Sequence, residues 1–185
     1  MTSKVIVTGA YCTGKTTHAQ DLQVALADRG HSCVLLPDVA RQCPLPLNAD
    51  QTEATSLWLF GNQVAAEIGA HFARPDFVLC DRGIPDIMTH HADLEARCTD
   101  GPVGLLLPFF DYWLSTYDLI LFSRVDETLL IEADGIRDTD ASYRTRLDSL
   151  AAASLTGRSN VVLLPSRRGE RLEVSLQAIS RLSRR

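Results

Sequence analysis

Residues 9–16 read Gly-Ala-Tyr-Cys-Thr-Gly-Lys-Thr, which is a complete match to the pattern G-x-x-x-x-G-K-[ST]. The stretch follows the apolar run at residues 5–8 and precedes a segment of helical character, so the context that the pattern requires is present. Glycines let the backbone wrap around a phosphate chain, and the free amides of a helix N-terminus attract its negative charge. The stretch therefore predicts a phosphate-binding loop between a strand and a helix.

The polar residues of this loop have expected roles in binding ATP and Mg²⁺. Lys15 can reach the β and γ phosphates, and the Thr16 hydroxyl can coordinate the metal ion. The residues that we predict to bind the nucleotide here are Gly9, Cys12, Thr13, Gly14, Lys15, Thr16 and Thr17.

On either side of the loop, short apolar runs alternate with longer segments of helical period, which is typical of βαβ units around a parallel sheet. Strands are predicted at residues 5–8, 33–36, 77–80, 119–122 and 161–164. Helices are predicted at residues 15–29, 50–72, 84–96, 104–117 and 168–182. We therefore expect an α/β fold of three layers, with a five-stranded parallel sheet and helices on both faces.

Length and composition favour a single domain that spans residues 1–185. The chain is 45% hydrophobic, and this length can bury a core without disulfides or a structural metal. Five cysteines are scattered without a C-x-x-C pair, so we expect reduced thiols and no zinc site. No apolar run approaches the roughly 20 residues of a membrane span, and the N-terminus lacks a signal-peptide pattern. We expect a cytoplasmic protein without a membrane partner.

Charge and lysine content exclude other function classes. The formal net charge of −5 argues against a dedicated nucleic-acid partner, although basic residues concentrate after residue 124. A GTPase would carry a base-selecting N-K-x-D segment late in the chain, and the only lysines are Lys4 and Lys15. The chain is also short for a motor, so its size favours a small-molecule kinase.

The third predicted strand runs into Cys-Asp-Arg-Gly at residues 80–83. Ligands of open α/β sheets bind at the carboxyl ends of the strands, where this segment would lie. Asp81 is a candidate metal ligand and catalytic carboxylate, and Arg82 is a candidate for binding phosphate or stabilising transferred charge. The structural alternative is that Asp81 caps the next helix and Arg82 pairs with it.

The second predicted strand ends in Pro-Asp-Val-Ala-Arg at residues 37–41. Asp38 would reach the same sheet edge, near the strand that precedes the phosphate loop, and could act as the general base for an acceptor hydroxyl. Arg41 would orient the acceptor. The alternative makes Asp38 a turn residue and Arg41 a solvated charge.

An arginine-containing insertion between residues 124 and 158 resembles a lid. Arginines that close over the γ phosphate exclude water and neutralise developing charge, and we select Arg137 and Arg144 for this catalytic role. A surface helix capped by Asp140, with Arg144 paired to it, explains the same residues structurally. Arg167, after the fifth strand, lies where adenine would rest.

Two further groups of residues have less specific patterns. Gln63 is a candidate acceptor-binding residue on the long helix at 50–72, together with Trp58, Phe60 and Glu67, although core packing is the favoured explanation of these residues. Adjacent histidines at residues 90 and 91 point apart on a helix, so we interpret them as surface residues and not as metal ligands.

Together, the segments GAYCTGKTT, PDVAR, CDRGIPD and DGIRDTDASYRTR resemble those of the small P-loop ATPases and kinases. That group includes the nicotinamide riboside kinase domain and the nucleoside and nucleotide kinases. The resemblance implies a P-loop NTPase fold with an arginine-bearing lid, and ATP- and Mg²⁺-dependent transfer. Lys15 and Thr16 match the phosphate and metal residues, Asp38 the acidic residue after strand two, and Asp81 and Arg82 the D-R pair. Arg137 and Arg144 match the lid arginines.

The expected function is therefore transfer of the γ-phosphate of ATP to a hydroxyl or phosphate of a small, nucleoside-like acceptor. Asp38, Arg41, Gln63 and Arg82 are the predicted acceptor-binding residues. A regulatory module that binds or slowly hydrolyses ATP is the alternative, and a kinase that acts within nucleic acid is a third hypothesis. The sequence leaves open the acceptor, homodimer formation and whether Asp38 or Asp81 is the base.

Overall fold

The computed structural model describes residues 2–97, 106–125 and 140–182, and within them a five-stranded parallel sheet forms the centre. The strands are β1 (Ser3–Thr8), β2 (Cys33–Leu36), β3 (Phe77–Asp81), β4 (Leu119–Ser123) and β5 (Val161–Leu164). Their spatial order is β2-β3-β1-β4-β5, and every neighbouring pair is parallel. Each predicted strand is present, so the predicted α/β fold class is confirmed.

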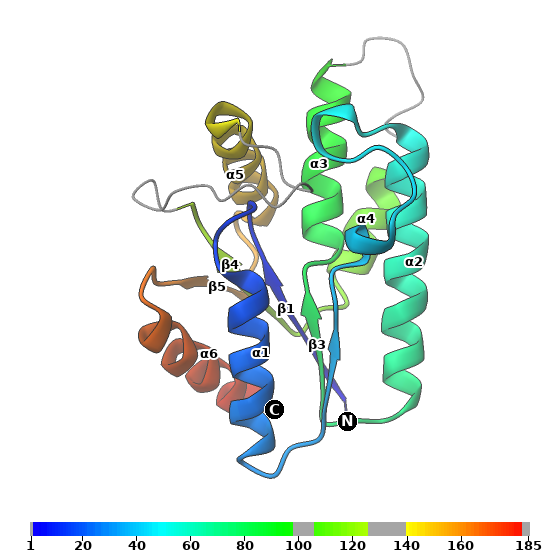
Figure 1. Ribbon diagram of the computed structural model, residues 1–185. Coiled ribbons are helices and arrows are strands. Elements are labelled where there is room, and N and C mark those ends of the chain that lie inside the picture. The colour runs from blue at the N-terminus through cyan, green and yellow to red at the C-terminus, as the bar shows by residue number, and fades with distance from the viewer. Residues whose placement is uncertain (1, 98–105, 126–139, 183–185) are drawn as a thin grey trace.

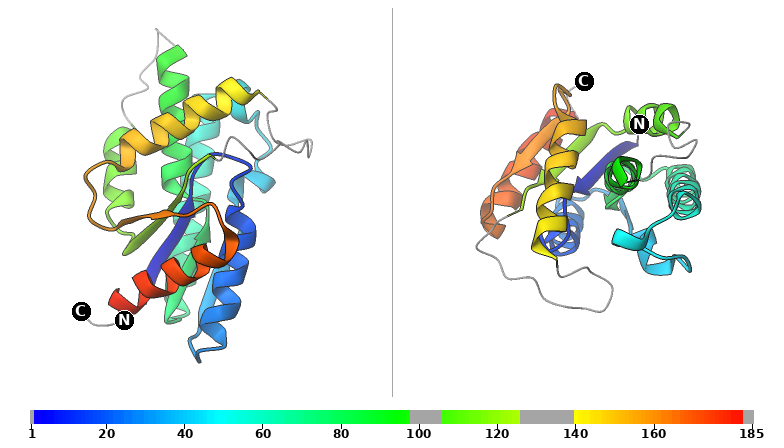
Figure 2. Two further views of the ribbon diagram at one scale, coloured as in Figure 1. Left: turned by 90° about the vertical axis from the view of Figure 1, so that its left-hand side faces the viewer. Right: turned by 90° about the horizontal axis from the view of Figure 1, so that it is seen from above.

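Helices cover both faces of the sheet (Figure 1). One face carries α1 (Lys15–Ala27) and α6 (Arg168–Leu182). The other face carries α2 (Glu53–Phe72), α3 (Ile84–Arg97) and α4 (Leu107–Leu114), and α5 (Ala141–Leu155) packs against α3. Two short 3-10 helices, η1 (Val39–Gln42) and η2 (Asn48–Asp50), connect β2 to α2. The result is the predicted three-layer arrangement, which Figure 2 shows from two other directions.

The alternation of side chains along β1 divides the core into two layers. Val5 and Val7 pack with the apolar residues of α1 and α6, whereas Ile6 packs with those of α2 to α5. All residues of β3 and β4 are buried, as expected for inner strands of a parallel sheet covered on both faces. This rigid centre fixes the positions of the loops at the carboxyl ends of the strands.

The central position of β1 places the phosphate loop between the loops that follow β3 and β4. Gly9 has a positive φ of 136°, and a Cβ atom there would lie 2.0 Å from the Ser123 carbonyl oxygen at the end of β4. Only glycine fits this position. The expected closeness of β2 to β1 is only indirect, because β3 lies between them.

The predicted lid segment consists of two parts. Residues 126–139, including Arg137, lie outside the described residues. The second part forms α5, in which Tyr143, Leu147, Ala151 and Leu155 are buried. Asp140 caps this helix by accepting a hydrogen bond from the Ser142 amide at 2.8 Å, as the structural alternative expected. Helix α5 therefore belongs to the packed body of the protein.

In the described part of the chain, no helix is both long enough and apolar enough to span a membrane.

Candidate functional site

The phosphate-binding loop connects β1 to α1 at the carboxyl edge of the sheet. Gly14, with a φ of 75°, directly precedes α1, and Cys12 also has a positive φ of 56°. Thr13 is buried and its hydroxyl donates to the Ala10 carbonyl. Thr16 and Thr17 occupy the first turn of α1, where Thr16 is half-buried and Thr17 is exposed. The predicted nucleotide-binding residues of the loop are therefore contiguous around one turn and one helix N-terminus.

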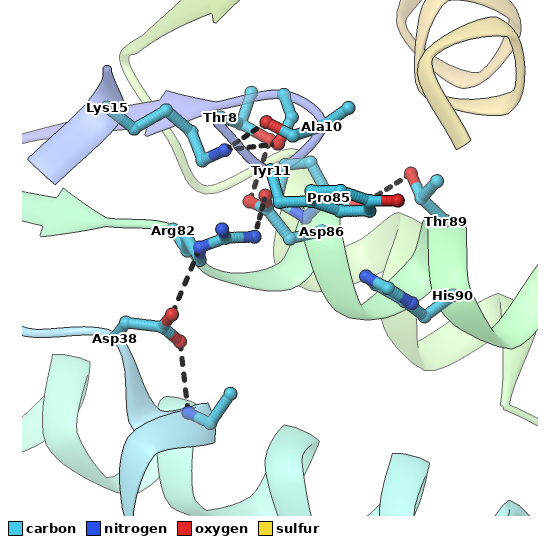
Figure 3. A network of polar contacts seen from close by, with 12 residues as sticks. Thr8, Ala10, Tyr11, Lys15, Asp38, Arg82, Pro85, Asp86, Thr89 and His90 are labelled. Carbon is cyan, nitrogen blue, oxygen red and sulfur yellow. Dashed lines mark hydrogen bonds and ion pairs between the residues drawn. The ribbon is translucent and has the colours of Figure 1, made fainter. Parts of the chain in front are cut away.

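The Lys15 ammonium group is turned back onto its own loop (Figure 3). Its Nζ donates to the carbonyl oxygens of Gly9, at 2.6 Å, and Ala10. Burial, and secondarily the positive charge of Arg82, lowers the pKa of Lys15 to about 7, although nearby carboxylates oppose the shift. The loop thus holds a lysine whose charge is poorly solvated and would be stabilised by an anion.

Asp81, at the end of β3, carries a buried carboxylate oxygen that has no hydrogen-bond partner among the described residues. Asp81 pairs with Val7 of β1 in the sheet register. Its negative charge is close enough to Lys15 to oppose the lowering of the pKa of that lysine. Its Oδ1 atom accepts no hydrogen bond from the described residues. A buried carboxylate oxygen without a donor is well suited to a metal ion or its bound water.

The residues present fit Mg²⁺ in this position. Within the described ranges, no group of three or more His, Cys, Asp or Glu side chains is arranged to hold a metal ion by itself. Mg²⁺ does not need such a group, because it usually takes one or two protein oxygens together with phosphate oxygens and water. The orphaned Asp81 oxygen and the Thr16 hydroxyl provide that limited set. The described cysteines are free thiols, as expected.

Arg82 lies between two carboxylates from different elements (Figure 3). Its Nε atom is 3.0 Å from Asp38 Oδ2, and its Nη1 atom is 3.5 Å from Asp86 Oδ1. Its backbone has a φ of 70°, which is strained for a residue with a side chain. Arg82 therefore pairs with Asp38 and Asp86 and not with Asp81, in contrast to the structural alternative.

Asp38 has both a structural contact and a place in the site. Its Oδ1 atom accepts a hydrogen bond from the Ala40 amide at 3.0 Å, which caps η1, and its Oδ2 atom contacts Arg82. Asp38 is thus both a turn residue, as the structural alternative expected, and a residue at the carboxyl edge of the sheet. Asp38 is anchored by two donors beside the loop.

Asp86 is a buried member of the site that the sequence analysis did not select. Its Oδ2 atom accepts a hydrogen bond from Thr8 Oγ1 at 2.8 Å and from the Gly83 amide at 3.3 Å. Burial raises the pKa of Asp86, while Arg82 and Lys15 oppose the shift. Asp86 connects the residue that precedes the phosphate loop with Arg82. Its place five residues after Asp81, in the first turn of the next helix, was the available signal.

A cavity opens beside the phosphate loop, on the side of β3 and α3. It encloses about 800 Å³ of empty space, part of it open to solvent. Apolar side chains from η1, α2 and α3 form part of its wall. Its charged and polar wall includes Thr16, Asp38, Arg41, Arg82, Asp86 and His90. Three of the predicted acceptor-binding residues, Asp38, Arg41 and Arg82, therefore face one space.

Gln63 lies apart from this cavity. It is 1% exposed, and its amide donates to Glu67 Oε1 at 2.8 Å. Glu67 also accepts from Lys4, Trp113 and Tyr117, which forms a buried network between α2 and the sheet. Gln63 and Glu67 are therefore buried structural residues, as the core-packing interpretation expected. Trp58 and Phe60 pack against the hydrophobic core on this face of the sheet.

The interpretation of His90 and His91 as surface residues is wrong. His91 is fully buried, with its Nδ1 atom 3.0 Å from Ser56 Oγ. His90 lines the cavity, and its Nδ1 atom is 2.9 Å from Tyr143 Oη of α5. Burial lowers the pKa of His90 to about 4, so its ring is neutral at pH 7. The helix α3 faces α2 on one side and α5 on the other, so adjacent positions can both be covered.

The two described arginines of the predicted nucleotide site differ in their placement. Arg144 is buried, and its guanidinium donates to the carbonyl oxygens of Tyr11 and Cys12 in the phosphate loop. The Arg167 side chain is 84% exposed and its contact with Glu170 is a surface ion pair. Arg171, one turn later, reaches the Thr13 carbonyl. No sequence pattern distinguishes Arg171 from the neighbouring arginines.

Comparisons with known proteins agree with this fold. A family model described as an AAA domain matches residues 4–171. A structure of deoxyadenosine kinase from M. mycoides has a TM-score of 0.68 and 9% identity, covering 96% of this chain and 98% of that chain. A NadR protein in complex with NR has a TM-score of 0.71 and 18% identity, covering 97% of this chain and 49% of that one. The chain thus spans about half the length of the NadR protein. No curated protein matches.

Proposed function

The chain belongs to the AAA domain family and has the fold of P-loop kinases, and on this premise we propose that it transfers the γ-phosphate of ATP to a small acceptor. The observation that carries the proposal is the cavity beside the phosphate loop. Thr16 of the loop shares its wall with Asp38, Arg41 and Arg82. A module that only binds and hydrolyses ATP does not require a structured cavity beside its phosphate loop.

The phosphate loop would bind the triphosphate through its backbone amides and Lys15. The Lys15 ammonium group would exchange the carbonyl oxygens of Gly9 and Ala10 for phosphate oxygens, which stabilise its charge better. Thr16 and Asp81 would hold Mg²⁺, which supplies charge neutralisation on the β and γ phosphates when bound.

Asp38 is our choice for the general base. The sequence left Asp38 and Asp81 as alternatives, and the cavity supports Asp38 because its carboxylate lines that space whereas Asp81 is absent from the wall. A carboxylate within hydrogen-bond reach can accept the proton of an acceptor hydroxyl as the phosphoryl group arrives. Arg82, fixed by Asp38 and Asp86, would orient the acceptor and stabilise charge on the transferred group.

The remaining predicted roles stay proposals. Residues 1–185 form one kinase domain, and the segment at 124–158 contributes Arg137 and Arg144, the latter from α5, which packs against α3. Arg41 orients the acceptor from the edge of the cavity, and Arg167 lies near the adenine ring of the nucleotide. The acceptor is nucleoside-like, since the cavity combines an apolar wall with hydrogen-bonding groups such as His90.

The direct test is ADP release from Mg·ATP by the purified protein. The reaction is measured alone and with nucleosides, nucleotides and other hydroxylated metabolites, with Lys15→Ala as the control. We expect one compound class to stimulate ADP release strongly and the stimulation to disappear in Lys15→Ala.

Other outcomes identify the alternatives. Slow ADP release that no compound changes would favour a regulatory ATPase. Stimulation by single-stranded DNA or RNA, with steep salt dependence, would favour a kinase that acts within nucleic acid.

A further inference from the structure

Three successive carbonyl groups of the phosphate loop are held by two arginines from distant parts of the chain. Arg144 of α5 donates through Nε to the Tyr11 oxygen and through Nη2 to the Cys12 oxygen, both at 3.2 Å. Arg171 of α6 donates through Nη1 to the Thr13 oxygen at 2.6 Å. The Ser123 hydroxyl, at the end of β4, donates to the same Thr13 oxygen at 3.1 Å.

Holding a carbonyl oxygen also orients the next amide. A trans peptide is planar, and its C=O and N–H bonds point in opposite directions. When the oxygens of Tyr11, Cys12 and Thr13 point toward the guanidinium groups, the N–H groups of the following residues point away from them. Those N–H groups belong to Cys12, Thr13 and Gly14, in the part of the loop where a phosphate would be bound.

From these contacts we infer that Arg171 and Arg144 are positioning residues, which fix the loop amides in the orientation that binds phosphate. The inference rests on the proposed function, because it needs a nucleotide phosphate in the loop. It also assigns Arg144 a role that does not require contact with the γ-phosphate. Neither arginine touches the reacting atoms in this role.

The surroundings of Arg171 show a fixed side chain and not a surface arginine. It is 6% exposed, and its Nε atom donates to the Pro165 oxygen at 2.6 Å, so the guanidinium bridges the β5–α6 loop and the phosphate loop. A Cβ atom on Gly14 would lie 3.3 Å from Arg171 Nη1. The absence of a side chain at Gly14 therefore lets the guanidinium pack closely against the loop.

An alternative role for Arg171 follows from its position after β5, where the sequence analysis expected the adenine ring. The two roles predict different ligand dependence. Orientation of loop amides affects every ligand that presents a phosphate chain, whereas contact with the base affects only nucleotides.

The test compares the binding of fluorescently labelled ADP and of inorganic pyrophosphate by the full chain. The variants are Arg171→Ala and, as a matched control in the last turn of the same helix, Arg181→Ala, which removes an exposed guanidinium of equal charge. We expect Arg171→Ala to weaken both probes by about 10- to 100-fold, because hydrogen bonds from a charged donor are lost. We expect Arg181→Ala to change both affinities by less than about threefold.

Two results would overturn the inference. One is unchanged affinity of folded Arg171→Ala for both probes, and the other is weakening for ADP without weakening for pyrophosphate. If Arg171→Ala does not fold, Ser123→Ala replaces it, with an expected weakening of about three- to tenfold for both probes and the same criteria. Failure of the wild-type protein to bind either probe would instead refute the proposed function.

Discussion

Lys15 changes its environment between the free protein and the nucleotide complex that we propose. In the free protein its ammonium group contacts two carbonyl oxygens, and burial lowers its pKa to about 7. A phosphate chain beside it would raise the pKa again, because an opposite charge favours the protonated form. Nucleotide binding and protonation of Lys15 are therefore coupled.

At pH 8, we expect Mg·ADP binding to take up a substantial fraction of one proton. Most free protein has a neutral Lys15 at this pH, since pH 8 lies above a pKa of about 7, and the complex carries it charged. Calorimetric titrations in buffers of different ionisation enthalpy measure this uptake as the slope of the observed enthalpy. Lys15→Arg is the control, because arginine stays charged and should take up none. A slope of zero for the wild-type protein would contradict the coupling.

Asp86 should affect catalysis through Arg82. Removal of its negative charge by Asp86→Asn leaves an amide that can still accept from Thr8, but it weakens the hold on Arg82. We expect kcat to fall by about 10- to 100-fold, while the affinity for ADP changes less than threefold. Steady-state kinetics with the acceptor identified by the ADP-release experiment would measure the change in kcat, and direct ADP binding would measure the change in affinity.

Thr8→Val is the matched control for this prediction. It removes the hydrogen bond from Thr8 to the Asp86 carboxylate and leaves the hydrogen bond from the Gly83 amide and the ion pair with Arg82. Its kcat should therefore fall less than that of Asp86→Asn. Equal losses in the two variants would show that packing at Asp86, and not the position of Arg82, matters.

At the scale of elements, α5 joins the predicted lid segment to the body of the protein. Its buried face contacts α3 and the phosphate loop, through Tyr143 with His90 and through Arg144 with the loop carbonyls. Tyr11 of the loop adds a hydrogen bond to the Asp140 carbonyl at 2.8 Å, at the start of α5. Because these contacts come from both ends of its first turn, α5 and the phosphate loop form one structural unit.

We expect Leu147→Ala to lower the free energy of unfolding by about 2–5 kcal/mol, because Leu147 is 1% exposed and the substitution leaves a cavity. Chemical denaturation measures the effect, and exposed Thr145→Ala on the same helix should change stability by less than about 0.5 kcal/mol. If α5 were a lid independent of the core, Leu147→Ala would leave the main unfolding transition unchanged.

The sequence predicted the elements well for a physical reason that does not apply to the whole site. Strands buried on both faces appear as short runs of aliphatic residues, and the phosphate loop is contiguous, so local patterns identify them. His90 and Arg171 contribute through contacts with other segments, which no local pattern encodes, whereas the one local signal for Asp86 was its place in the first turn of the helix after β3. Gln63 shows the converse, since a polar residue on a long helix can face either a ligand or a buried partner such as Glu67.

At the scale of the whole molecule, two histidines connect the packing of the layers to pH. His18 of α1 is 1% exposed, and its Nε2 atom is 2.9 Å from Ser175 Oγ of α6, whereas His90 joins α3 to α5. Burial, and secondarily the charge of Arg171, lowers the pKa of His18 to about 4 against the opposing effect of Asp21. Both imidazoles are therefore neutral at pH 7 in the folded protein.

The sign of the pH effect follows from these pKa values. Between pH 6.5 and about 4 the unfolded chain binds more protons at His18 and His90 than the folded protein does, so stability falls as the pH falls through this window. Each histidine can contribute roughly 3 kcal/mol of this loss by pH 4. Asp86 opposes it, because a carboxyl group with a raised pKa gains a proton more readily in the folded state.

A variant isolates the histidine contribution from that of the carboxylates. His18→Gln keeps a side chain able to bond Ser175 but removes the titration, so its free energy of unfolding should decrease less than that of the wild-type protein between pH 6.5 and 4.5. Urea denaturation across this range measures the difference, and exposed His71→Gln should follow the wild-type curve. Parallel curves for His18→Gln and the wild-type protein would mean that the α1–α6 contact tolerates a charged imidazole, and that His18 does not contribute to the loss of stability in acid.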